Sequence, residues 1–159
     1  MADPVDEAVS KVEAAAAEVL RDYAALSAWS ILTDQPIDVA IEGDDILALV
    51  IRTMGPDYDN SFEPGAQTLN TLTLDVEAVA REAGVIKAKR AREGLAHALT
   101  ALAADRTLGG MLQDMQEIDA ATGDGQRRDI SAISLQFRLQ YLTARGNPFT
   151  ILGHAGASF

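Results

Sequence analysis

The 159-residue chain contains no cysteine, and this absence removes several classes of function. Without thiols the chain can form no disulfide, no thiolate metal site and no cysteine nucleophile. Only 5% of the residues are aromatic, and no apolar run approaches the ~20 residues that a membrane-spanning helix needs. The opening residues, MADPVDEAV, have neither a basic region nor an apolar core. We therefore expect no secretory signal peptide and no membrane segment. A chain without cysteine is also compatible with a reducing cytoplasm.

Basic residues are scarce in the first part of the chain. Residues 1–63 contain 14 Asp and Glu against 3 Lys and Arg, whereas residues 64–159 contain 10 of each group. The whole net charge of −11 therefore lies in the first part. Such a field repels nucleic acid and argues against conventional DNA or RNA binding. A solvated acidic face is the plainer interpretation, and an acidic, salt-adapted host would produce a similar composition.

The remaining composition is that of an ordinary globular protein, and its length predicts one domain over residues 1–159. Apolar residues at three- and four-residue spacing predict an N-terminal helix within residues 1–28. Asp3 would cap this helix, and Pro4 would be its first helical residue. A second apolar stripe predicts a helix that runs into Asp105.

Alternating apolar and polar residues predict strands along the rest of the chain. The expected strands cover residues 37–41, 46–53, 71–78, 111–122 and 133–141. In the last of these, Phe137 and its apolar neighbours should face the helices and Arg138 the other side. This order predicts an α+β fold: an antiparallel or mixed sheet of four to five strands with two main helices packed on one face. Residues 146–159 are expected to form an extended or loose C-terminal segment.

Residues 54–68 have two prolines, two glycines and three acidic residues, which predict a long loop that is functional or mobile. Oxygen donors alternate from Asp57 to Glu63, as they do in calcium-binding loops. The loop lacks the glycine and the glutamate that calcium loops have at their sixth and twelfth positions, where Phe62 and Thr68 stand. A solvated loop is therefore the favoured interpretation, and we expect no metal.

No combination of residues indicates catalysis. The glycines of the stretch DRTLGG follow a predicted helix, whereas those of a phosphate-binding loop precede one, so we expect Gly109 and Gly110 to turn the chain toward a strand. His97 and His154 have no nucleophile or carboxylate at a triad or zinc spacing. The basic run KAKRAR, residues 87–92, could contact phosphates but is interpreted as a helix face opposite acids of the first part of the chain. We expect neither enzymatic activity nor a cofactor.

The order of these segments is informative as a whole. An N-terminal helix precedes the apolar strand ALVIRTMG, which opens into the acidic loop PDYDNSFEPGAQ and the alternating segment NTLTLDVEAVA. A helix then ends in DRTLGG, and the last strand, ISLQFRLQYLTARGNP, alternates up to a tyrosine before a proline. From about Leu47 onward this order resembles phage tail terminator proteins, the minor tail protein U type, also called tail completion proteins. Residues 37–41 and the segment after Pro148 are less typical of that family.

The resemblance implies an α+β subunit that forms a ring, expected to be a hexamer, at the head-proximal end of a phage tail tube. The ring would end tube polymerisation and present a surface to the neck or head connector protein. Its partners would be further copies of itself, the tail tube protein and that connector, in a virion assembled in the host cytoplasm. DNA would only pass through the lumen, without specific binding, and no membrane would be involved. Expected interface residues are Asp57, Tyr58, Asp59, Asn60, Phe62, Glu63, Arg138 and Phe149.

Two alternatives remain open at this point. A neck or head-closure protein also forms rings and would account for the same features. A small ligand-binding or metal-binding α+β domain, built around the acidic loop 57–63, would be a different class of protein. Oligomeric state separates the classes, because a ring favours assembly and a monomer with metal-dependent melting favours a binding site.

Overall fold

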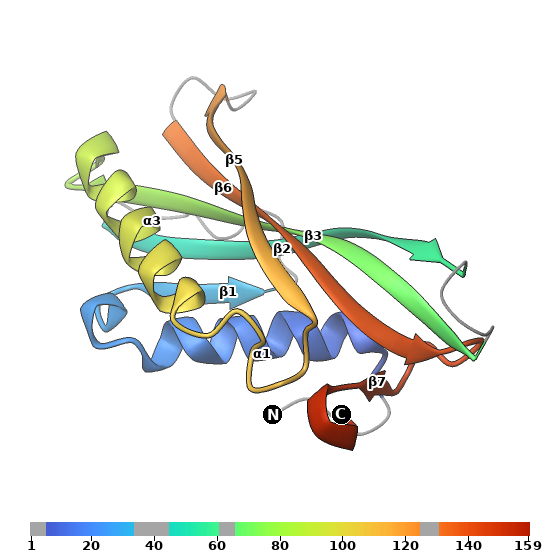
Figure 1. The fold of residues 1–159 in the computed structure, drawn as a ribbon. Coiled ribbons are helices and arrows are strands. Elements are labelled where there is room, and N and C mark those ends of the chain that lie inside the picture. Colours follow the sequence, from blue (N-terminus) through green and yellow to red (C-terminus); the bar gives the residue numbers. More distant parts are fainter. Residues whose placement is uncertain (1–5, 34–44, 61–65, 125–130) are drawn as a thin grey trace.

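A curled sheet covers two long helices in the computed structural model of this chain, which describes residues 6–33, 45–60, 66–124 and 131–159 (Figure 1). The helices are α1 (Ala8–Asp22) and α3 (Ala88–Ala103), with short 3-10 turns η1 (Ala24–Leu26) and η2 (His154–Gly156). The strands are β1 (Ser30–Thr33), β2 (Ile46–Asp59), β3 (Gln67–Glu82), β4 (Val85–Ile86), β5 (Asp114–Asp124), β6 (Ser131–Ala144) and β7 (Ile151–Leu152).

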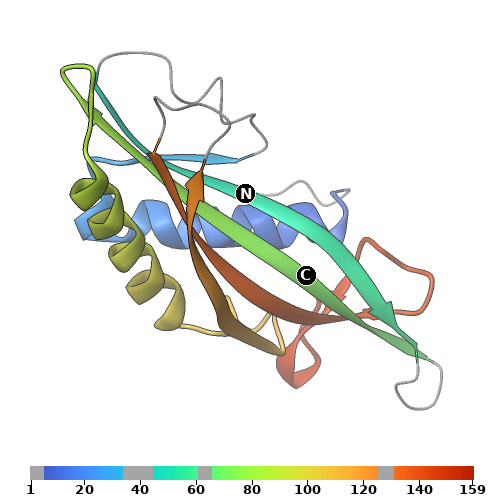
Figure 2. The same ribbon diagram turned by 90° about the horizontal axis from the view of Figure 1, so that it is seen from above.

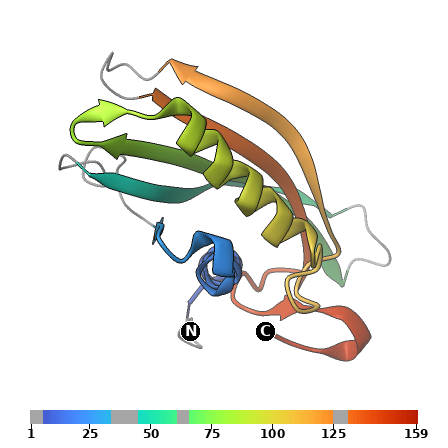
Figure 3. The same cartoon turned by 90° about the vertical axis from the view of Figure 1, so that its left-hand side faces the viewer.

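The five longer strands lie in the order β1-β2-β3-β6-β5. β1 runs parallel to β2, and the other pairs are antiparallel. The two-residue strands β4 and β7 pair with β3 and β6. Figure 3 shows α1 almost end-on and α3 crossing the same side of the sheet. The predicted α+β fold, with a mixed sheet and two helices on one face, is therefore confirmed.

The alternation of β6 is the feature that the sequence predicted best. Phe137, Leu139 and Tyr141 are buried toward the helices, with exposed fractions of 1% or less, whereas Arg138 is exposed on the other face. On the neighbouring strand β3, the row from Leu72 through Ala78 is buried in the same core. The apolar faces of β3 and β6 therefore form the floor on which the helices pack.

The predicted loop at residues 54–68 is wrong over most of its length. β2 continues to Asp59 and β3 begins at Gln67, so this part of the chain is a long hairpin. The pairing shifts between Met54 and Asp57, where Gly55 has a φ of 105°. Proline cannot donate a hydrogen bond to a ladder and is tolerated at such a bulge, which glycine also favours. Residues that are typical of a loop therefore mark a bulge.

The two helices end as their sequences indicate. The expected cap Asp3 and the expected strand 37–41 lie outside the described residues, but the stripe of α1 is buried as predicted. After α3, the carboxylate of Asp105 accepts hydrogen bonds from the backbone N–H of Thr107 (3.0 Å) and of Gly109 (2.8 Å). Gly109 and Gly110 have φ angles of 74° and 93°, which glycine adopts without strain. The stretch DRTLGG is thus a turn between helix and strand.

The C-terminal segment is folded, contrary to the expectation of a loose tail at residues 146–159. Ile151 is fully buried and exchanges two backbone hydrogen bonds of 3.0 Å with Phe159. A Cβ atom at Gly153 would lie 2.4 Å from the Phe159 ring and 2.6 Å from the carbonyl oxygen of Gly110. The small residues that indicated flexibility instead allow this close packing.

This C-terminal segment also contacts α1. The backbone N–H of Ala8 donates to the Pro148 carbonyl (2.7 Å), and the Lys11 ammonium donates to the carbonyls of Phe149 (2.7 Å) and Phe159 (3.3 Å). The first and last described parts of the chain therefore lie side by side.

Trp29 packs against α3 at a position that only glycine can occupy. A Cβ at Gly94 would lie 2.4 Å from Cη2 of the Trp29 ring, which is itself only 6% exposed. The Arg90 guanidinium lies 5.7 Å from the centroid of that ring. Helix propensity alone would favour alanine at residue 94 by about 1 kcal/mol, so the glycine is explained by this contact.

We expect Gly94→Ala to lower the free energy of unfolding, because overpacking of about 1–3 kcal/mol exceeds the gain in helix propensity. In a Trp29→Leu background, where the ring is absent, the same substitution should be neutral or stabilising. Urea unfolding followed by circular dichroism gives all four corners of this double-mutant cycle. Stabilisation by Gly94→Ala in the original background would show that the contact does not constrain α3.

The faces of β6 predict a second contrast. Phe137→Ala should lower the free energy of unfolding by about 3–5 kcal/mol, because it leaves a cavity in the core. Arg138→Ala should change it by about 0.5 kcal/mol or less, as expected for an exposed side chain. Thermal melts of the two variants give the comparison, and a larger loss for Arg138→Ala would mean that the register of β6 is wrong.

Candidate assembly surface

The far end of the β2–β3 hairpin projects past the N-terminal end of α1 (Figures 1 and 2). We call residues 54–59 of β2 and 67–73 of β3 the arm. Met54 and Tyr58 on the arm are 54% and 64% exposed, which is unusual for such large apolar side chains. Of the expected interface residues, the arm contains Asp57, Tyr58 and Asp59, and Asn60 directly follows it.

The strand alternation places these residues on two faces of the arm. Tyr58 pairs with Asn70, which belongs to the buried row of β3, so Tyr58 lies on the side of the helices. Asp57 and Asp59 pair with Thr71 and Leu69 and lie on the opposite, outer face. The alternating oxygen donors that resembled a calcium loop are therefore explained by the period of a strand.

A hollow of about 320 Å³ lies on the inner side of the arm. It is lined by Tyr58, Asn60, Thr68, Arg145, Gly146, Asn147 and Pro148. The Asn60 side-chain oxygen accepts a hydrogen bond from the Thr68 hydroxyl (2.6 Å), and its backbone carbonyl accepts one from the Arg145 guanidinium (2.7 Å). Arg145, which the sequence did not single out, therefore connects the end of the arm to the segment after β6.

The buried side-chain amide of Asn70 connects the arm to β6. Asn70 is 2% exposed, and its side-chain NH₂ donates to the carbonyls of Thr68 (3.1 Å) and Tyr141 (3.2 Å) and to the Thr143 hydroxyl (3.0 Å). Sequence reasoning missed Asn70, although the available signal was an amide at a position where the alternation of β3 requires an inward-facing residue.

Burial, with smaller contributions from Tyr58 and Glu7, raises the pKa of Tyr141 to about 12. This phenol therefore stays neutral at physiological pH.

The other expected interface residues do not gather at the arm's inner side. Arg138 is exposed on the outer face of the sheet, in one cross-strand row with Thr73 and Met54. Phe149 is 50% exposed and lies beside α1, where its carbonyl accepts the bond from Lys11. Phe62 and Glu63 lie outside the described residues. The structure thus brings together Tyr58 and Asn60 and places Arg138 on the opposite face of the sheet, whereas Phe149 directly follows Pro148, which lines the same hollow as Tyr58.

Charged side chains form a network on the outer face of β2 and β3. The Arg52 guanidinium forms ion pairs with Glu77 and, at 3.6 Å, with Asp75. Asp75 is only 7% exposed. Its burial raises the pKa of its carboxyl group, while a hydrogen bond with Gln136 and the charge of Arg52 act in the opposite direction. This arrangement fixes neighbouring strands and brings no nucleophile to the surface.

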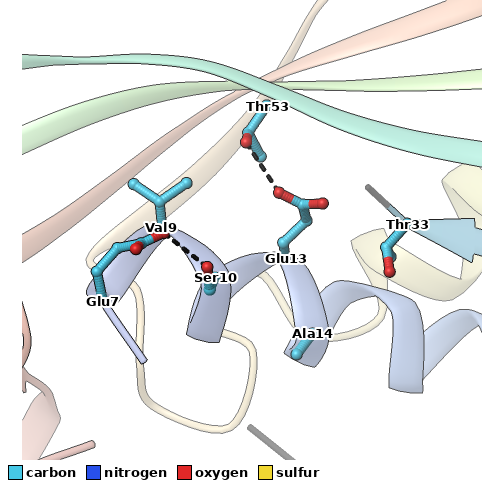
Figure 4. A pocket seen from close by; sticks show the side chains of 7 residues that line it. All are labelled: Glu7, Val9, Ser10, Glu13, Ala14, Thr33 and Thr53. Carbon is cyan, nitrogen blue, oxygen red and sulfur yellow. Dashed lines mark hydrogen bonds between the residues drawn. The ribbon is translucent and has the colours of Figure 1, made fainter. Parts of the chain in front are cut away.

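A second hollow of about 510 Å³ lies between α1, the end of β1 and the middle of β2. Figure 4 shows the lining residues, Glu7, Val9, Ser10, Glu13, Ala14, Thr33 and Thr53. The Glu13 carboxylate accepts a hydrogen bond from the Thr53 hydroxyl (2.9 Å), and Glu7 accepts one from Ser10 (2.6 Å). The lining residues that the structure describes are mostly polar, and none of them carries an imidazole, an amine or a thiol that could act as a general base or nucleophile beside these carboxylates.

Metal-binding side chains are not clustered in the described parts of the chain, where no group of three or more His, Asp or Glu could hold an ion. His154 contributes to the C-terminal packing, because its Nε2 lies 2.8 Å from the Leu112 carbonyl oxygen. His97 lies against Tyr23, with 6.1 Å between the ring centroids. No helix in the described ranges is both long and apolar enough to cross a membrane.

No protein-family description matches the sequence, and no curated protein matches it.

The buried carboxyl of Asp75 leads to a prediction about pH. Because its pKa in the folded protein is above its usual value of 3.8, the folded state holds this proton more tightly than the unfolded state. The stabilising contribution is therefore present at low pH and is lost as the pH rises from 3.8 through the folded pKa. Asn cannot ionise, so Asp75→Asn should become progressively more stable relative to the original protein as the pH rises. Urea unfolding of both proteins between pH 3 and 7 measures this difference, and the opposite trend would mean that attraction to Arg52 outweighs burial.

Proposed function

We propose that this protein is a structural subunit that forms a ring at the head-proximal end of a phage tail tube, ends tube polymerisation and provides the docking surface for the neck or head connector protein. The observation that supports this proposal most is the arm, which extends past the helices with exposed side chains on both faces. A cyclic ring needs a contact between two different patches of each subunit. A rigid projection that reaches a neighbouring copy would supply one of the two.

The edges of the sheet offer further contact surface. β1 pairs only with Ala48–Ile51 of β2, so residues 52–59 have no strand on that side within the described ranges. At the other edge, β5 pairs with β6 alone among the described strands. Uncovered edges are available for pairing with another chain, and monomeric proteins usually protect them.

The acidic composition is compatible with the same function. DNA that passes through a tail should not adhere to the ring, and the net charge of −11 would reduce its affinity for phosphates. The tail tube protein on one side and the connector on the other would be the partners, within the virion. The arm equally supports a neck or head-closure ring, whereas a small-ligand domain would have to bind its ligand in a hollow such as those lined by Tyr58 or by Glu13.

An oligomer is the first expected result. Native mass spectrometry and light scattering should show a ring of about six copies, alone or with tube protein. Met54→Ser combined with Tyr58→Ser should abolish it without changing the melting temperature, since both side chains are more than half exposed. Ala25→Ser, at an exposed residue of η1, serves as the control and should assemble normally. Deleting residues 57–65 is a poorer test than the sequence implies, because it would remove paired residues of β2.

The assignment to tails is tested in the parent virus. Loss of this protein should give filled heads without tails, together with tails of excessive length. Electron micrographs of normal tails joined to heads would reject the terminator function, and tails of normal length that fail to join heads would favour the neck alternative.

A further inference from the structure

We propose that copies of this chain dock head to tail, with the acidic outer face of one arm seated on the basic face of α3 in the next copy. The acidic face consists of Asp57 and Asp59. The basic face consists of Lys89 and Arg92, and Lys87 is the residue just before the helix. The proposal rests on the proposed function, because it names the two patches through which the ring closes.

The basic face of α3 lacks partners in its own subunit. Lys87, Lys89 and Arg92 are exposed and form no ion pair within the described parts of the chain. Arg90, from the same run, instead lies over Trp29 and pairs with Glu93 at 3.2 Å. The expected pairing of this run with acids from the first part of the chain is therefore not present among the described residues.

These cations do not stabilise the helix that contains them. The first turn of α3 has no acidic residue, and no side chain caps it within the described structure. Positive charge at this end of a helix is unfavourable, because the backbone N–H groups already give it a partial positive charge. Carboxylates supplied by a neighbouring copy would interact favourably with both the side chains and the helix end.

The acidic patch has a spacing that matches. Asp57 and Asp59 are exposed and point to the same face of β2, so they are separated by about 7 Å along the strand. Lys89 and Arg92 are three residues apart on one helix face, with about 5–6 Å between their Cβ atoms. Long, flexible cationic side chains can therefore meet both carboxylates at once.

The two patches lie at opposite ends of the subunit. Figures 1 and 2 show that α3 begins beside the β3–β4 turn, at the end of the sheet away from the arm. A subunit cannot join its own two ends. Each copy would give its arm to one neighbour and receive the arm of another, which is the contact that closes a ring.

A charge swap tests this pairing. One variant has Asp57→Lys and Asp59→Lys, and the other has Lys89→Glu and Arg92→Glu. Each alone should be monomeric by native mass spectrometry and analytical ultracentrifugation, with the circular dichroism spectrum of a folded subunit. An equimolar mixture should recover the oligomer, because the basic arm of the first fits the acidic helix of the second and the reverse pair also matches. One chain with all four substitutions should assemble as well.

The control and the contrary outcomes separate this inference from the proposed function. Arg106→Gln removes an exposed cation beyond the other end of α3, one that pairs with Glu117 at 3.9 Å in its own subunit, and should assemble normally. If the original protein forms a ring and both charge-reversed variants do too, the docking is wrong and the ring stands. If the variants dissociate but their mixture stays monomeric, the two patches do not contact each other. A protein that remains monomeric at all concentrations, with tube protein present, overturns the proposed function and the docking together.

Discussion

β3 is the constraint on which the rest of the structure depends. It pairs with β2 over residues 69–81 and with β6 over residues 67–78, so it positions both halves of the sheet. The buried side chains of β3 pack against the helices on one face of the sheet. On the other face, its residues Asp75 and Glu77 form ion pairs with Arg52 of β2. A shift of one residue in either ladder would exchange these two faces. The position of the arm follows from this strand, because the outer half of β2 has no other neighbour among the described strands.

Sequence reasoning succeeded where the structural cause is local. The faces of β6 and the stripes of α1 and α3 depend on periodicities within one segment, and Phe137 and Arg138 lie as predicted. It failed where a distant segment decides. Gly55 and Pro56 are residues typical of a loop, but the pairing of β2 with β3 makes them part of a bulged strand. Ile151 is buried because it pairs with β6 and with Phe159, which no local pattern indicates. β1 was missed because four residues are too few to show an alternation.

The candidate site shows the same limit. The sequence selected the acidic stretch of the arm, but it could not indicate that Asp57 and Tyr58 face opposite ways, because strand pairing decides that.

The groups with shifted pKa values do not lie together in one site. Burial raises the pKa of Asp75 and of Tyr141, and hydrogen bonds from Thr107 and Gly109 lower that of Asp105. Asp75 lies on the outer face of the sheet, Tyr141 lies on its inner face beside the arm, and Asp105 follows α3. Each pKa shift therefore has a separate structural cause, and the three groups do not line one pocket.

The bonds between α1 and residues 148–159 have a consequence for how the protein is made in the cell. Lys11 and its acceptors at Phe149 and Phe159 are separated by 138 and 148 positions in the chain. At typical translation rates the helix leaves the ribosome about 7–30 s before those acceptors are synthesised. During that interval the helix lacks the contacts of the segments that are synthesised last, namely β6 and residues 148–159. The subunit would therefore complete its fold only after translation of the C-terminal segment.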